Sequence, residues 1–267
     1  MKKVLTIAGS DSSGGAGIQG DLKAFSANET FGMSVITAVT AQNTQGVYMV
    51  HDIPKEVIQA QIKALFNDVA IDGIKIGMVS IPDTIEMIAR TLSLYCLPKI
   101  VLDPVMVSKS GSNLLQPAAV NALKEQLIPM AFLITPNIPE AEVLTGIKIL
   151  SEDDMIMAAR ELMNLGCGGV LLKGGHLDGP AVDILHDGKE ITRFEADRIS
   201  SNNNHGTGCA LSSTICSNLA KGYSLPVAVE KGKSYVYESI SNGFSVGKGV
   251  GALHHFHSFY EGGDHNE

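Results

Sequence analysis

Val4-Leu5-Thr6-Ile7-Ala8 is followed by Gly9-Ser10-Asp11-Ser12-Ser13-Gly14-Gly15 and then by an amphipathic segment that begins near Ala16. A short apolar run, a glycine-rich turn and a helix in this order are typical of one strand–helix unit of an α/β domain. Similar units recur along most of the chain, and such alternation indicates a mostly parallel sheet between helices. No linker or internal repeat divides the sequence, so we expect one domain over residues 1–267.

The alternation can be divided into expected elements. The main strands are predicted at residues 4–8, 34–41, 73–76, 100–103, 132–135 and 170–173, followed by a hairpin at 182–186 and 190–194. The helices are predicted near residues 16–27, 55–68, 82–94, 117–127, 152–165, 208–221 and 226–243. Several of these helices begin beside a proline, which is favoured in the first helical turn.

Composition excludes several classes of partner. The chain has 28 acidic and 20 basic residues, a net charge of −8, no tryptophan and 5% aromatic residues, which argues against a nucleic-acid surface. No run reaches the roughly 18 apolar residues of a membrane helix. The four cysteines show no C-x-x-C pair and no disulfide framework. We therefore expect a cytoplasmic protein without nucleic-acid or membrane partners.

The segments that follow the predicted strands carry chemically useful groups. In open α/β sheets, ligands bind beyond the carboxyl ends of the strands. The polar and charged groups expected there are Gln42, Asp103, Asn137 with Glu140, and Lys173. An amide, carboxylates and a lysine on one rim predict a ligand site at that edge of the sheet.

His205-Gly206-Thr207-Gly208-Cys209 opens a small-residue helix. The first turn of a helix has backbone N–H groups without intrahelical partners, and with the helix dipole they form an anion site. A thiol in this turn should have a lowered pKa. The segment is thus expected to combine a phosphate cradle with an ionisable group, although a glycine turn with a small buried cysteine would have the same sequence.

The chain as a whole resembles a known family. The motifs that carry the resemblance are Thr6–Gln19, Ala41-Gln42-Asn43-Thr44, Lys75-Ile76-Gly77-Met78, Leu102-Asp103-Pro104-Val105-Met106, Ile134-Thr135-Pro136-Asn137, Leu172-Lys173-Gly174-Gly175-His176 and His205–Cys209. In this order, from about residue 4 to 257, they are similar to the hydroxymethylpyrimidine/phosphomethylpyrimidine kinases of thiamine biosynthesis. The resemblance implies a ribokinase-like three-layer sandwich, usually dimeric, with ATP as the phosphoryl donor and magnesium as a cofactor.

The implied reaction is the ATP-dependent phosphorylation of 4-amino-5-hydroxymethyl-2-methylpyrimidine and then of its monophosphate to the diphosphate. The resemblance places the pyrimidine near Gly9, Asp21, Gln42, Met78 and Val105. It associates Asn137 and Glu140 with magnesium and phosphate, and Lys173, Thr207 and Lys233 with the nucleotide. It makes Gly206, Gly208 and Cys209 catalytic, with the cysteine at the position where many related sugar kinases have an aspartate base.

Two other functions remain open at this point. A pyridoxal kinase of the same fold is the nearer one, although Gln42-Asn43-Thr44 favours the pyrimidine. A non-catalytic pyrimidine-binding regulatory protein is the other, and the presence of Lys173, Glu140 and Cys209 argues against it. Departures from the family pattern at Gly20, at residues 201–204 and at Ala210 concern details of the nucleotide loops.

Overall fold

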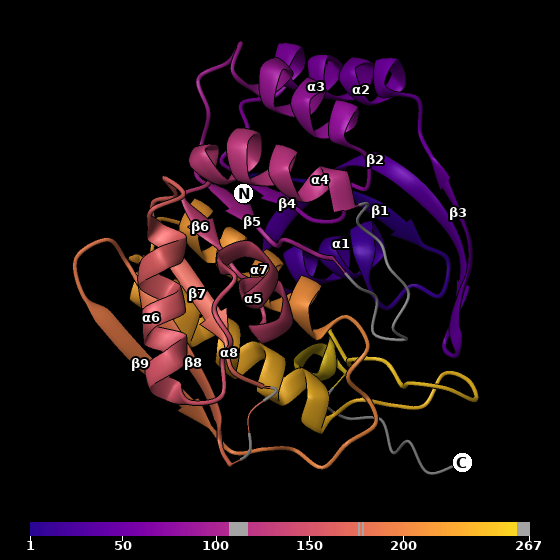
Figure 1. Cartoon of the computed structure of the whole chain (residues 1–267). Coiled ribbons are helices and arrows are strands. Elements are labelled where there is room, and N and C mark those ends of the chain that lie inside the picture. Colours follow the sequence, from indigo (N-terminus) through magenta and orange to yellow (C-terminus); the bar gives the residue numbers. More distant parts are fainter. Residues whose placement is uncertain (107–116, 176, 178, 261–267) are drawn as a thin grey trace.

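The structure is a computed structural model that describes residues 1–106, 117–175, 177 and 179–260 (Figure 1). Its described strands form one nine-stranded sheet in the order β3-β2-β1-β4-β5-β6-β7-β8-β9. The strands are β1 (Lys2–Asp11), β2 (Thr30–Asn43), β3 (Gly46–Asp52), β4 (Gly73–Ile76), β5 (Ile100–Leu102), β6 (Leu133–Ile134), β7 (Val170–Lys173), β8 (Ala181–His186) and β9 (Ile191–Ala196).

The central strands are parallel and the sheet edges are antiparallel. β1 pairs in parallel with β2 and β4, with Val4 opposite both Gly32 and Gly73, and the parallel pairing continues through β5 and β6 to β7. The hairpin partners β3, β8 and β9 are antiparallel. The central strands β4 and β5 are buried on both faces, and apart from Lys75 they contain no charged or polar side chain, as is typical of parallel strands covered by helices.

Helices cover both faces of this sheet, as the expected α/β sandwich requires. The helices are α1 (Gly17–Ala27), α2 (Lys55–Asp68), α3 (Pro82–Leu92), α4 (Pro117–Ala122), α5 (Ile138–Thr145), α6 (Glu152–Met163), α7 (Thr207–Ala220) and α8 (Leu225–Ser241). One apolar core lies under α2 to α6, and a second lies under α1, α7 and α8. The predicted three-layer architecture is confirmed.

Two elements were not predicted. β3 forms an antiparallel hairpin with β2, and β2 extends through Gln42, which pairs with Val47. Gln42 therefore lies within a strand and not after one. The second element is the eight-residue helix α5, which begins directly after Asn137. In addition, the expected helix over residues 117–127 divides into α4 and a five-residue π-helical turn, Leu123–Leu127.

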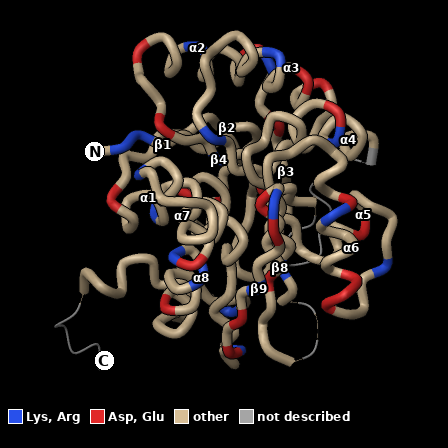
Figure 2. Tube along the Cα trace, turned by 90° about the vertical axis from the view of Figure 1, so that its left-hand side faces the viewer, with Lys and Arg blue, Asp and Glu red and all other residues tan. Residues whose placement is uncertain are grey.

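Charged residues are distributed over the whole described chain. Figure 2 shows Lys and Arg interspersed with Asp and Glu along the trace. The described helices include none that is both long enough and apolar enough to cross a bilayer. His176, the last residue of one of the motifs, lies outside the described residues.

Candidate active site

A cleft of about 1320 Å³ lies at the carboxyl ends of the parallel strands. Its wall is formed by the loops after β1, β5 and β7, by the β2–β3 hairpin and by the first turn of α7. The predicted residues that line it are Gly9, Gln42, Met78, Val105, Asn137, Glu140, Lys173, Gly206, Thr207, Gly208, Cys209 and Lys233. Thus a single cavity collects groups from sequence positions far apart, as expected for the switch region of an α/β sheet.

The first turn of α7 is built around a left-handed glycine. Gly206 caps the helix with φ +83°, and a Cβ there would lie 1.9 Å from the carbonyl oxygen of Gly15. Only glycine therefore fits this position without rearrangement. The Gly206 carbonyl accepts a hydrogen bond from Ala210, so the N–H groups of the intervening residues have no partner in the preceding turn. The predicted phosphate cradle has the geometry of a helix N-terminus that faces the cleft.

Cys209 lies in this first turn as expected, but its acidity is not as expected. Burial raises the pKa of its thiol to about 11, although the positive charge of Lys75 opposes the change. Asp21 and Asp103 add negative charge nearby and also raise this pKa. The expectation of a lowered pKa is therefore wrong for the resting protein, because desolvation outweighs the helix terminus.

Lys173 brings a positive charge beside the cradle. Its Nζ lies 3.0 Å from Oδ1 of Asp103, a buried carboxylate that also accepts a hydrogen bond from Thr135. Lys173 Nζ and Asp103 Oδ2 each lie 3.5 Å from the place where a Cβ on Gly208 would be. Against the opposing effect of burial, Lys173 and Lys75 lower the pKa of Asp103, so this carboxylate is ionised.

Asn137 and Glu140 form the capping box of α5. The Glu140 N–H donates to Asn137 Oδ1 at 2.9 Å, and the Asn137 N–H donates to Glu140 Oε2 at 2.8 Å. This N-x-x-E element consequently has a structural role whatever its chemistry. Burial raises the pKa of Glu140 to about 7. The negative charge of Asp103 also raises this pKa, whereas the positive charge of Lys173 lowers it.

Asp21 is not at the cleft surface, and its expected contact with a pyrimidine is corrected. Its side chain is fully buried, and it accepts hydrogen bonds from Thr6 Oγ1 at 2.6 Å, Ser213 Oγ at 2.7 Å and Lys75 Nζ at 2.9 Å. These three donors occupy both carboxylate oxygens. Asp21 therefore holds Lys75, and Lys75 in turn lines the cleft.

Lys233 also reaches the cleft as one member of an ion pair. Its Nζ lies 2.5 Å from Oδ2 of Asp183 on β8, while Asp183 Oδ1 accepts the N–H of Gly174 at 2.9 Å. The pair joins α8 to the loop after β7. Lys233 thus lines the cleft, and its charge is balanced by Asp183.

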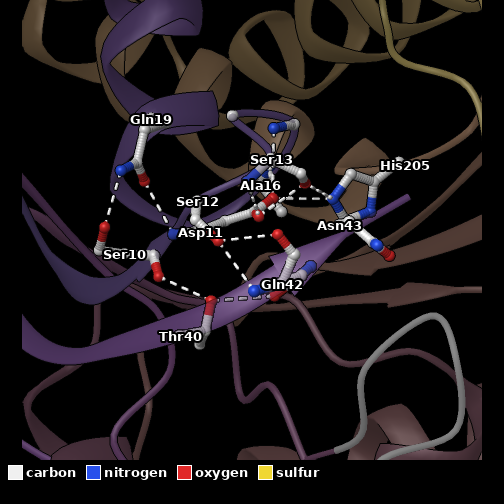
Figure 3. Close-up of polar contacts among 12 residues, drawn as sticks. Ser10, Asp11, Ser12, Ser13, Ala16, Gln19, Thr40, Gln42, Asn43 and His205 are labelled. Carbon is white, nitrogen blue, oxygen red and sulfur yellow. Dashed lines mark hydrogen bonds and ion pairs between the residues drawn. The ribbon is translucent and has the colours of Figure 1, made fainter. Parts of the chain in front are cut away.

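Gln42 projects from β2 beside the loop after β1, as Figure 3 shows. Its backbone is fixed by Ser12, whose hydroxyl donates to the Gln42 carbonyl and accepts from the Gln42 N–H, both at 2.8 Å. The Thr40 hydroxyl lies 3.2 Å from Gln42 Oε1 and 3.0 Å from the carbonyl of Ser10. The amide oxygen is therefore turned toward the protein (Figure 3).

Several functional candidates were missed by the sequence prediction. Asp11, Lys75, Asp103 and Asp183 all line the cleft but were not assigned roles. Asp103 was noted at a strand end, and Lys75 and Asp11 lie inside quoted motifs, so these three had a local signal. Asp183 had none, because its importance comes from Lys233, 50 residues away.

The sequence comparisons with known proteins point to one family. A family model described as phosphomethylpyrimidine kinase matches residues 11–254. The hydroxymethylpyrimidine/phosphomethylpyrimidine kinase of Rhizobium meliloti is 48% identical over 261 residues, which cover 96% of this chain and 98% of that protein. The thiamine biosynthesis bifunctional protein ThiED of Geobacter sulfurreducens is 49% identical over 253 residues, 94% of this chain, but the match spans only 52% of that protein.

Solved structures give the same fold. A phosphomethylpyrimidine kinase from Clostridium difficile has a TM-score of 0.81 and 52% identity, covering 90% of this chain and all of that chain (100%). A pyridoxal kinase from Bacillus subtilis, in an ADP complex, has a TM-score of 0.90 and 38% identity, covering 97% of this chain and 99% of that chain. The expected ribokinase-like fold is confirmed by this agreement.

Proposed function

This chain belongs to the phosphomethylpyrimidine kinase family, and on that premise we propose that it phosphorylates 4-amino-5-hydroxymethyl-2-methylpyrimidine and then the monophosphate, using ATP. The observation that carries the proposal is the cleft in which Gln42, Lys173 and the N-terminus of α7 face one ligand space. Phosphoryl transfer requires positioning and charge neutralisation more than covalent chemistry. These are the contributions that the described residues can make.

Each group has a distinct part in the proposed transfer. With its oxygen turned toward Thr40, the Gln42 side chain presents its NH2 group to a ring nitrogen of the pyrimidine. Gly9, Met78 and Val105 supply apolar contacts around the ring. The N–H groups that begin α7 and the Lys173 ammonium stabilise charge on the transferred phosphoryl group.

Cys209 is the proposed acceptor of the hydroxymethyl proton. Its sulfur belongs to the same helical turn as the phosphate cradle, so the alcohol and the phosphoryl group would meet beside it. Because the thiol pKa is about 11 in the resting protein, the thiolate is a minor species at neutral pH. The proposal therefore implies that the reaction proceeds through this minor ionised form.

The described residues fit a magnesium ion that is shared with ATP. No group of three or more His, Cys, Asp or Glu in the described part of the chain could hold a metal by itself. Magnesium commonly keeps several waters and binds to one or two carboxylates plus substrate phosphates. Glu140 and Asp103, which line the cleft near each other, would supply these carboxylates, and the ion would neutralise phosphate charge.

Glu140→Gln should shift the magnesium dependence of turnover to higher concentration and lower kcat. Glutamine supports the same capping box, so α5 should remain intact while the negative charge is lost. The pKa of Glu140 is about 7 in the folded protein and has an ordinary value of 4.5, so the folded state keeps this proton to a higher pH than the unfolded state does. The free energy of unfolding therefore falls as the pH rises from 4.5 to 7. The variant should therefore be the more heat-resistant protein at alkaline pH.

Magnesium titrations of turnover and thermal melts at acidic and alkaline pH measure both effects. Glu142→Gln, on the same helix but paired with Lys148 at 3.0 Å, is the matched control and should leave the titration unchanged. If the Glu140→Gln titration superimposes on that of the unmodified protein, Glu140 is only a helix cap.

Pyridoxal is a second candidate substrate, because a pyridoxal kinase shares this fold closely. We expect a higher kcat/KM for hydroxymethylpyrimidine than for pyridoxal, measured with ATP and magnesium. Gln42→Ala should lower kcat/KM for the pyrimidine by about fivefold to 150-fold, since an unpaired buried polar group costs roughly 1–3 kcal/mol. A preference for pyridoxal would assign the chain to the second function, and turnover of neither compound would favour a binding protein.

The proposal also includes a homodimer in the cytoplasm. β3 is an edge strand, and its Tyr48 and Met49 side chains are 68% and 67% exposed. Exposed apolar edge strands in native proteins are commonly covered by a partner. A second copy of the chain on this edge is therefore consistent with the family's usual assembly.

A further inference from the structure

Asp11, at the end of β1, holds together two segments of the cleft wall. Its Oδ1 accepts the N–H and the hydroxyl of Ser13 at 2.8 and 2.7 Å, and its Oδ2 accepts the N–H groups of Gly15 and Ala16 at 3.2 and 2.8 Å. Oδ2 also lies 2.8 Å from Nε2 of His205 (Figure 3). Four of these contacts shape the local loop, but the fifth reaches a residue 194 positions away.

The ionised state of the Asp11 carboxylate determines which atom is the donor in its contact with His205. Although burial opposes it, the hydrogen bonds from His205 and Ser13 hold the pKa of Asp11 at about 2, so the group is ionised at working pH. An ionised carboxylate only accepts hydrogen bonds, so the His205 Nε2 carries the proton and donates it. The contact consequently does not require a charged imidazole.

His205 connects Asp11 to the phosphate cradle. It directly precedes Gly206, and a Cβ on Gly15 would lie 2.2 Å from the imidazole Cδ2. A Cβ on Gly206 would likewise lie 1.9 Å from the Gly15 carbonyl oxygen. Gly15 therefore packs directly against the His205 imidazole and against the backbone of Gly206, and neither glycine has room for a side chain.

The same loop is also tied to the substrate side. Ser12, next to Asp11, exchanges two hydrogen bonds with the backbone of Gln42, each of 2.8 Å. Asp11 and Ser12 are adjacent, so the loop connects the Gln42 strand to the His205 turn through two short contacts.

We infer that Asp11 and His205 are positioning residues that fix the distance between the substrate amide, Gln42, and the phosphate cradle at the start of α7. The inference deepens the proposed function and depends on it for the identity of the substrate. Misplacement of reacting groups by about 1 Å can cost roughly a hundredfold in rate. The pair should therefore affect turnover far more than the binding of either substrate.

His205→Leu and His205→Gln separate positioning from simple packing. Leucine keeps apolar bulk against Gly15 but cannot donate, whereas the glutamine amide can donate to Asp11 from a similar distance. We expect His205→Leu to lower kcat by about a hundredfold and to change the KM values by less than about threefold. The kcat of His205→Gln should be at least about tenfold higher than that of His205→Leu. In an Asp11→Asn/His205→Leu double variant the contact between the two side chains can be lost only once, so the combined loss of kcat should be smaller than the product of the two single losses.

His257→Leu is a matched control. This histidine is also partly buried and paired with a carboxylate, Glu238 at 3.6 Å, but neither residue lines the cleft. Its kcat should be unchanged. A His205→Leu enzyme with normal kcat, or a loss that glutamine does not restore at all, would overturn the inference.

Amide hydrogen exchange makes the test independent of the substrate. Addition of a non-hydrolysable ATP analogue should slow exchange in residues 12–16 of the unmodified protein and of His205→Gln, but not of His205→Leu. If the unmodified protein phosphorylates neither hydroxymethylpyrimidine nor pyridoxal and still shows this exchange pattern, the proposed function fails while the positioning role holds. Equal protection in His205→Leu and the unmodified protein would refute the positioning role regardless of turnover.

Discussion

Cys209→Ser should lower kcat by roughly two to four decades and change KM for the pyrimidine little, the range usual for loss of a general base. Serine preserves the size of the side chain and the first turn of α7, but its hydroxyl ionises far above any working pH. The phosphate cradle, Lys173 and Gln42 remain in place, so both substrates should still bind. Steady-state kinetics with ATP and hydroxymethylpyrimidine measure the effect.

The raised pKa of Cys209 adds a second, independent expectation. With a thiol pKa of about 11, kcat/KM of the unmodified protein should rise with pH. The rise should be about tenfold per unit between roughly pH 8 and 10, because only the thiolate accepts a proton. Cys209→Asp would replace the thiol with a carboxylate that is ionised at a much lower pH, so this rise of kcat/KM with pH should disappear.

Cys96→Ser is the control for Cys209, because Cys96 is exposed and does not line the cleft. It should change neither kcat nor the pH profile. If Cys209→Ser retains near-normal kcat and the profile of the unmodified protein is flat, the thiol only fills space. The N–H groups of α7 and Lys173 would then account for the catalysis.

The fold was largely predictable from local sequence. The predicted limits of β4, β7 and α2 agree with the structure because each of these two strands is mainly apolar, with a single lysine, and because Pro54 precedes the first turn of α2. The two missed elements also had signals. Val47-Tyr48-Met49-Val50 has strand composition, and the spacing of Asn137 and Glu140 is that of a capping box.

The arrangement of the site was predicted less completely than its location. A strand-end rule brings Lys173, Glu140 and Gln42 to one cleft, and the structure places them there. The same rule cannot tell that Asp21 faces inward to Lys75, since this depends on contacts between residues 54 positions apart. For Cys209 the helix position was correct, but the balance between helix terminus and desolvation depends on tertiary packing.

Lys173→Met should lower kcat by about a hundredfold to a thousandfold, the usual effect of removing one preorganised group that stabilises transition-state charge. Methionine keeps much of the length of the side chain but removes the ammonium beside Gly208. The charge is normally present, because Asp103 and Glu140 raise the pKa of Lys173 despite its burial. Steady-state kinetics should show the loss mainly in kcat, with Lys173→Arg retaining part of the activity.

Stability must be separated from catalysis in this experiment. Removal of Lys173 leaves the buried Asp103 carboxylate with the hydroxyls of Thr135 and Ser212 and the more distant charge of Lys75, and breaking a buried ion pair commonly costs about 3–5 kcal/mol. The double variant Lys173→Met/Asp103→Asn removes that uncompensated charge and should recover much of the lost melting temperature without recovering kcat. Asp103 is also a proposed magnesium ligand, so the reference for kcat is the single variant Asp103→Asn. A double variant as active as Asp103→Asn would show that Lys173 acts only by neutralising Asp103, whereas a further loss of kcat would support a contact between the Lys173 ammonium and the transferred phosphoryl group.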